Sequence, residues 1–193
     1  VLDSNKKFSD WDGLITYAKA HPDDVTTGGS GAGGLDECVA SQFAASVGID
    51  ITYVPYSGYG EYKTAFLGGE VDLYIDKLSS YSKMAQYSEI IPLAVTSEEK
   101  VSTAGLDNVP SVKELGFDFT AGSWRGIVVK AGTPENVVSK LSELCATIYQ
   151  SDEFQNVLKT DSADVVYGYK SAAEFKSFIA QETDRFSAVI SNP

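Results

Sequence analysis

The stretch of residues 25–76 decides the fold of this chain. It contains VTTGGSGAGGLDE at residues 25–37, ITYVPYSGYGE at 51–61 and FLGGEVDLYID at 66–76. Each piece carries a short run of β-branched or aromatic residues, which favours a strand, and a glycine turn next to a helical pattern. This alternation predicts an α/β fold with a mainly parallel sheet flanked by helices.

The first piece predicts an anion-binding loop. Five glycines lie within residues 28–34, and they let the backbone approach a ligand closely and adopt positive φ. The helix that follows presents unpaired N–H groups at the positive end of its dipole. We therefore predict that backbone amides bind a small anionic or polar ligand; a tight strand-to-helix turn without a ligand is the structural alternative. The predicted ligand-binding residues are Gly29, Ser30, Gly31, Gly33 and Gly34.

The alternation continues along the chain. The pattern predicts strands at 25–28, 51–54, 71–75, 90–95, 124–129 and 164–167. It predicts a helix between Ser9 and Pro22, a short helix capped by Ser111 and Glu114, and helices at 35–47, 60–67, 77–86, 134–150, 152–159 and 172–190. Ligands of such sheets bind beyond the carboxyl ends of the strands. Residues 28–34, 55–60 and Asp76 all follow strands, so we expect them to converge on one site.

Composition limits the function classes. The chain has 193 residues, enough for one ample domain or two small ones, with 27 acidic and 15 basic residues and a net charge of −12. Such a charge argues against a nucleic-acid partner, which needs a basic patch. The two cysteines, Cys38 and Cys145, fall on apolar helical faces and are predicted to be buried free thiols. No apolar run reaches the roughly 18 residues of a membrane span.

Enzymatic alternatives have little support in the sequence. Residues 29–34 fit the G-x-G-x-x-G pattern of dinucleotide sites, but Asp50 precedes the next strand where an acid should end it. The sole histidine, His21, lies at a helix end before Pro22 and suits a capping role better than a catalytic triad. No cluster has metal-ligand spacing. We predict a protein that is not an enzyme and has no metal or cofactor. Two alternatives remain: an NAD(P)-binding oxidoreductase fragment, and a module that mediates interactions and binds no ligand.

Five segments in register resemble one known family. They are VTTGGSGAGG, GIDITYVPYSG, LGGEVDLYID, PLAVTSEEK and LDNVPSVKELGFDFTAGSWRGIVVKAGTP. In order and spacing they are similar to the solute-binding proteins of tripartite tricarboxylate transporters, the Bug or TctC-like family. The resemblance covers nearly the whole chain.

The resemblance implies a two-lobed, class II periplasmic-binding-protein-like fold whose cleft captures a carboxylate metabolite. It also implies an extracytoplasmic location, in the periplasm or as a cell-surface lipoprotein, and delivery of the solute to membrane permease subunits. Family members are about half as long again. Residues 1–122 then correspond to the second lobe and 123–193 to the segment that returns to the first lobe. The chain shows no signal segment, as expected of a mature fragment.

Some residues of the glycine loop depart from the family pattern. The family has serines where this chain has Gly29 and Gly34, and a histidine where it has Glu37. Asp36 and Glu37 also lie in the first turn of helix 35–47, where they stabilise the helix dipole but repel an anion. Ser30 is positioned to replace one lost hydroxyl. The departures leave open an amine-bearing or neutral solute.

Two further residues match binding positions of the family. Tyr56 matches the tyrosine of its VPY segment, and Asp76 matches its strand-end aspartate, which suits a ligand hydroxyl or amine. The structural alternatives are a surface aromatic for Tyr56 and the N-cap of helix 77–86 for Asp76. Trp124 is expected to pack in a core or hinge.

Overall fold

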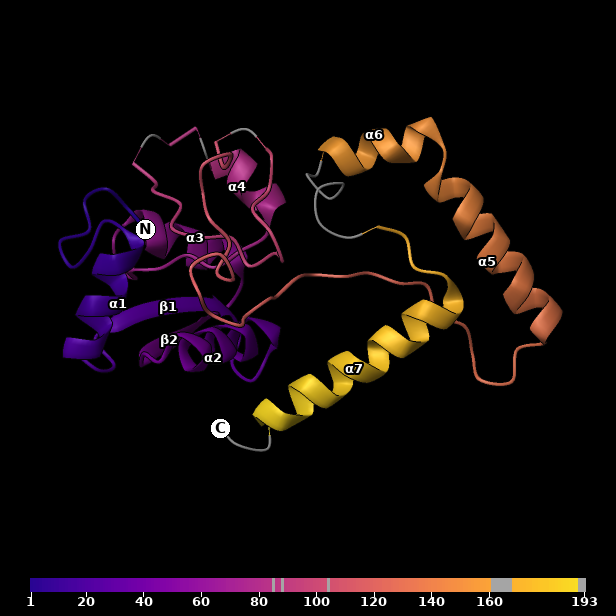
Figure 1. The fold of residues 1–193 in the computed structure, drawn as a ribbon, viewed down its shortest axis with the longest axis horizontal. Helices are drawn as coiled ribbons and strands as arrows, with labels where there is room; N and C mark the ends of the chain where they lie inside the picture. Colours follow the sequence, from indigo (N-terminus) through magenta and orange to yellow (C-terminus); the bar gives the residue numbers. More distant parts are fainter. Residues whose placement is uncertain (85, 88, 104, 161–167, 191–193) are drawn as a thin grey trace. The chain divides into compact units, whose positions relative to one another are not determined.

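The chain folds into two compact units, Val1–Gly122 and Ser123–Pro193. This computed structural model describes residues 1–84, 86–87, 89–103, 105–160 and 168–190 (Figure 1). The predicted strand 164–167 lies outside the described residues. Which lobe each unit forms stays a prediction, and each unit is described by itself.

The first unit alternates helices and strands. Its elements are α1 (Trp11–Ala20), β1 (Val25–Ser30), α2 (Leu35–Val47), β2 (Ile51–Tyr56), α3 (Tyr59–Leu67) and α4 (Leu78–Met84). β1 and β2 pair in parallel, in a register that runs from Val25 opposite Ile51 to Ser30 opposite Tyr56. Helices α2 and α3 pack against these strands (Figure 1). The parallel pairing and the flanking helices confirm the predicted α/β class.

Three predicted strands are wrong among the described residues, because their partners do not continue a regular ladder. In 71–75, the amides of Asp72 and Leu73 both donate to the same carbonyl, that of Thr26, at 3.1 and 2.9 Å. Segment 90–95 forms only isolated pairs, and Pro92 in its middle has no N–H to donate. Segment 124–129 is exposed and forms no strand.

The helix termini follow their capping chemistry. Asp10, and not Ser9, caps α1, because its carboxylate accepts the amide of Gly13 at 2.7 Å. α3 ends at Leu67 before two glycines, as predicted, and Gly69 there has a φ of +74°. Ser111 and Glu114 form the expected reciprocal bonds, but they close a series of turns and not a helix. The capping prediction therefore succeeds at α3 and fails in detail at the other two sites.

Two apolar clusters form the core of the first unit. In the larger one, the ring of Trp11 from α1 lies edge-on to Phe43 of α2, with centroids 6.0 Å apart, and close to Phe117. The smaller cluster gathers Tyr62 and Phe66 of α3 with apolar side chains from other segments of the same unit. Burial of these large side chains is the main stabilising contribution to the unit. Cys38 and Cys145 are free, as predicted, but they are half-buried and not fully buried.

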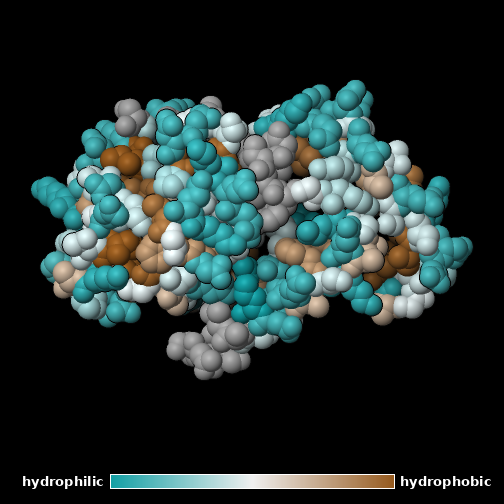
Figure 2. Space-filling model, viewed as in Figure 1, coloured by the Kyte–Doolittle hydropathy of each residue, from teal (hydrophilic) through white to brown (hydrophobic). Residues whose placement is uncertain are grey.

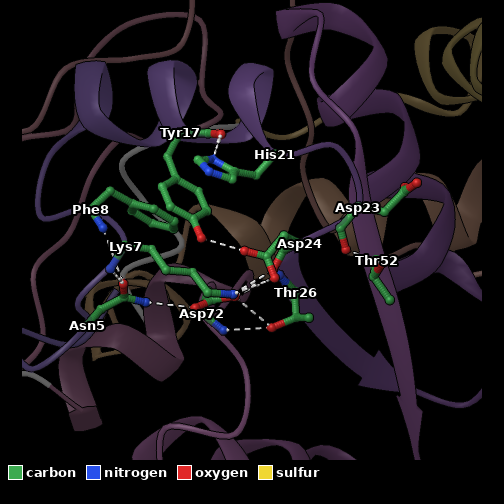
Figure 3. A network of polar contacts seen from close by, with 10 residues as sticks. All are labelled: Asn5, Lys7, Phe8, Tyr17, His21, Asp23, Asp24, Thr26, Thr52 and Asp72. Carbon is green, nitrogen blue, oxygen red and sulfur yellow. Dashed lines mark hydrogen bonds and ion pairs between the residues drawn. The ribbon is translucent and has the colours of Figure 1, made fainter.

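A polar network fixes the amino end of β1 (Figure 3). The carboxylate of Asp72 accepts the amide and the hydroxyl of Thr26 at 2.9 and 2.8 Å, the Asn5 amide at 2.9 Å and Lys7 Nζ at 3.0 Å. Burial lowers the pKa of Lys7, but its hydrogen bond to Asp72 and the charges of Asp72 and Asp24 outweigh burial and raise it. Asp72 thus joins three segments that are distant in sequence.

The second unit consists of α5 (Glu135–Tyr149), α6 (Asp152–Thr160) and α7 (Ala172–Ile190) with the extended segment before them. Ser171 and Glu174 form the predicted capping box at the start of α7. Trp124 packs edge-on against Phe175 and Phe178 of α7, with centroids 5.5 and 5.6 Å away. Trp124 therefore packs against a helix, but it is 41% exposed and does not lie in a buried core.

Apolar side chains remain exposed on the second unit, where Figure 2 shows brown patches among hydrophilic residues. Val128 is 82% exposed and Ile127 is 76% exposed. α5 and α6 contribute no buried residue. In the part of the chain that the structure describes, no helix has both the length and the apolar character needed to cross a membrane.

Candidate functional site

The carboxyl ends of β1 and β2 meet at the predicted glycine loop. Gly29 and Ser30 belong to β1 itself, so the loop proper is 31–34. Ser30 lies opposite Tyr56 in the ladder, and the Gly31 amide donates to the Tyr56 carbonyl at 2.8 Å. The structure therefore brings the first two predicted motifs together at one edge.

Glycine is required at these positions for two separate structural reasons. Gly31 and Gly33 have φ of +76° and +70°, which the turn requires. Gly28 and Gly29 instead permit close approach. A Cβ on Gly28 would lie 2.7 Å from the ring of Tyr56, and one on Gly29 would lie 2.5 Å from the Cβ of Asp36. Neither strand position has room for a side chain.

Two amides, one at the end of β1 and one in the loop, bind carboxylates of the chain itself. The Ser30 amide donates to Oδ2 of Asp36 at 2.9 Å, and the Gly33 amide donates to Oε2 of Glu37 at 2.6 Å. Both acids lie in the first turn of α2, whose N-cap, Gly34, has no side chain with which to cap it. In this structure the amides of Ser30 and Gly33 therefore bind internal carboxylates, and ligand binding by this loop stays a prediction.

In the second motif, residues 51–61, a backbone amide again donates to a carboxylate of the chain itself. The amide and hydroxyl of Ser57 donate to Oε2 of Glu61 at 2.9 and 2.5 Å, and these two bonds lower the pKa of the Glu61 carboxyl. The ring of Tyr56 is half-buried and stacks on Tyr62 with centroids 5.7 Å apart. The side chain of Tyr56 thus packs against the body of the unit.

Asp76 is the third part of the predicted binding site, after the glycine loop and Tyr56. Its carboxylate accepts the Tyr74 hydroxyl at 2.9 Å and the Lys77 amide at 2.7 Å. Because α4 begins at Leu78, Asp76 precedes the N-cap position and does not cap the helix. Burial first, and then the charge of Asp76, raises the pKa of Tyr74, so this phenol stays a hydrogen-bond donor.

Tyr53 and Tyr59, which sequence reasoning missed, connect the motifs. The Tyr59 hydroxyl donates to Oδ1 of Asp36 at 2.6 Å, and its ring lies 5.4 Å from Lys77 Nζ, beside Asp76. The Tyr53 hydroxyl donates to the Gly31 carbonyl at 2.9 Å. Burial, with the charges of Asp36 and Glu37, raises the pKa of Tyr53 to about 12. The sequence feature that could have identified them is their spacing, because Tyr53 and Tyr59 lie three residues before and three residues after Tyr56.

The carboxyl-end edge of the β1–β2 pair therefore offers negatively charged hydrogen-bond acceptors. Asp36, Glu37, Glu61 and Asp76 each accept a backbone amide there, and Lys77 is a cation that contacts this group through Tyr59. No group of three metal-ligating side chains occurs within the described ranges. The arrangement suits recognition of a small polar molecule.

Comparison with known proteins identifies related chains. The family model described as "Tripartite tricarboxylate transporter family receptor" matches residues 3–192. The "UPF0065 protein in gbd 5'region" of Cupriavidus necator is 25% identical over 176 residues, which cover 91% of this chain and 52% of that protein. The chain thus spans about half the length of this curated relative.

Solved structures share the fold. A TctC solute binding protein from Polaromonas, solved with no ligand, superimposes with a TM-score of 0.80 at 22% identity, covering 100% of this chain and 65% of that one. An R. palustris protein with adipate gives a TM-score of 0.78 at 26% identity, covering 98% of this chain and 62% of that one. These likenesses confirm the predicted periplasmic-binding-protein-like fold class.

Proposed function

Since the chain belongs to the tripartite tricarboxylate transporter receptor family, we propose that it forms part of an extracytoplasmic receptor that captures a small carboxylate-bearing metabolite. The observation that carries this proposal is the family match over residues 3–192. The adipate in the R. palustris relative supports a carboxylate as the ligand class.

The proposal extends to partners and location. The receptor works in the periplasm or as a cell-surface lipoprotein and delivers its solute to the permease subunits of the transporter. It binds no nucleic acid, in keeping with its net charge of −12. It is a binding protein and not an enzyme, and it uses no cofactor.

The two units take different places in the two-lobed fold. Val1–Gly122 forms the second lobe, and Ser123–Pro193 is the segment that returns to the first lobe. The exposed Ile127 and Val128 support this assignment, because such side chains are normally covered in a folded protein. The sheet of the first lobe is the surface that would cover them.

The solute binds at the edge formed by the glycine loop, Tyr56 and Asp76. Closure of the lobes over the solute then exposes a surface for the permease. The alternative, an NAD(P)-binding oxidoreductase, is disfavoured because Asp50 precedes β2 and no acid ends that strand.

A thermal-shift screen of the whole gene product that contains this chain tests the proposal. The panel contains di- and tricarboxylates, aromatic acids, amino acids, amides and NAD. A ligand at 100 times its Kd stabilises the folded state by about 2.7 kcal/mol, so one carboxylate class should raise the midpoint clearly. A shift with NAD alone would favour the oxidoreductase, and no shift with any carboxylate-bearing compound would refute the receptor.

A further inference from the structure

We propose that Asp36 determines the specificity of this lobe, directing the glycine loop to a solute group that donates hydrogen bonds, an ammonium or a primary amide, in place of a second carboxylate. The inference rests on the proposed function, because it concerns the same site. The expected solute has a carboxylate at one end and a donor group at the end that faces this lobe.

The position of Asp36 is set from two sides. Oδ2 accepts the Ser30 amide at 2.9 Å, and Oδ1 accepts the Tyr59 hydroxyl at 2.6 Å. Ser30 ends β1 and Tyr59 begins α3, so two separate elements hold the carboxylate in place. An amide that already binds an internal carboxylate is not open to the carboxylate of a solute.

The glycine at position 29 is the steric counterpart of Asp36. A Cβ at Gly29 would lie 2.5 Å from the Cβ of Asp36 and 2.8 Å from its Oδ2. A side chain at position 29 and an acid at position 36 therefore compete for one volume. This observation is independent of the hydrogen bonds, and it shows that Asp36, together with the Tyr53 hydroxyl at 2.7 Å, fills the space that a Cβ at position 29 would need.

The charges around Asp36 favour a donor group. Glu37 and Asp76 lie at the same edge, and Lys77 is the cation in contact with Tyr59. A carboxylate oxygen has about two acceptor sites, and each oxygen of Asp36 makes one of the bonds described above. Asp36 can therefore accept further bonds from an ammonium or an amide, whereas a carboxylate there would meet like charge.

Isothermal titration calorimetry of the whole gene product tests this with matched probes. Succinate, glutarate and adipate are compared with their monoamides, which have the same size, and with 5-aminopentanoate, in which an ammonium replaces one carboxylate of adipate. We expect at least one monoamide or 5-aminopentanoate to bind at least tenfold more tightly than the matching dicarboxylate. We expect Asp36→Ser to reduce that preference at least tenfold.

Two further variants serve as checks. Asp36→Asn removes the charge with little change of shape, so it should lose the preference for ammonium even if Asp36→Ser folds poorly. Asp118→Ser removes an acid whose side chain is 98% exposed, and it should leave the preference unchanged. A dicarboxylate that binds more tightly than its monoamide and its ammonium analogue would overturn the inference and leave the receptor function intact. An unchanged preference in both Asp36 variants would also overturn it. Failure of every carboxylate-bearing probe would refute the receptor function and the inference together.

Discussion

We expect Asp72→Ala to lower the free energy of unfolding of the first unit by about 2–6 kcal/mol, because two hydrogen-bond donors of Thr26 lose their acceptor. The carboxylate accepts four hydrogen bonds, two of them from Thr26, and its side chain is only 11% exposed. Lys7 is 29% exposed, so water can replace its lost partner. The amide and hydroxyl of Thr26 cannot be solvated as easily, and each costs about 1–3 kcal/mol when left unpaired.

Urea denaturation followed by tryptophan fluorescence measures this loss. Trp124 belongs to the second unit, so Trp124→Phe leaves Trp11, in the core of the first unit, as the reporter. Asp24→Ala is the matched control, because Asp24 also pairs with Lys7, at 3.5 Å, but its side chain is 50% exposed. We expect a much smaller loss there. Equal losses in the two variants, or a loss below about 1 kcal/mol for Asp72→Ala, would refute the reasoning.

Three further predictions follow from close contacts and from a raised pKa. Gly29→Ala should cost about 1–3 kcal/mol in urea unfolding, and less in an Asp36→Gly background, because a Cβ there lies 2.5 Å from that of Asp36; equal costs in both backgrounds would contradict this. The pKa of Tyr53 is raised from its usual value of 10.0 to about 12, so the protonated phenol contributes fully to stability below pH 10, and this contribution is lost as pH rises towards 12. Unfolding midpoints measured from pH 8 to 12 should therefore fall less steeply in Tyr53→Phe than in the parent chain. Gly126→Ala should displace Phe175, whose ring would clash with the added Cβ, and change the Trp124 fluorescence; Phe175→Ala in the same chain should remove the clash, and an unchanged spectrum in Gly126→Ala would argue against the contact.

Local signals predicted the helices well. The bounds of α2, 35–47, agree with the sequence because a glycine loop precedes it and Gly48, at a φ of +69°, ends it. Such signals act within a few residues, so the sequence carries them directly. The capping box at Ser171 and Glu174 succeeded for the same reason.

Strands that depend on distant partners were predicted less well. Segment 71–75 has a strand composition, yet its Asp72 turns its carboxylate to Thr26 and to the amino-terminal segment in place of a regular ladder. Segment 124–129 reads as a strand, but the described residues of its unit provide no sheet for it. Composition predicts a tendency to pair, whereas pairing itself requires a partner at the correct distance.

The sequence by itself determined the α/β class with a mainly parallel sheet, the family and the position of the glycine loop, whereas the pairing of β1 with β2 came from the structure. The sequence also placed Asp36 and Glu37 at the start of α2. Only the tertiary structure decided that these acids turn back onto the amides of Ser30 and Gly33, and that Tyr59 reaches Asp36 from 23 positions away. The reason is physical: which amide donates to which carboxylate depends on the backbone path through the loop and on the packing of α2 and α3 against the strands, and neither is a property of local sequence.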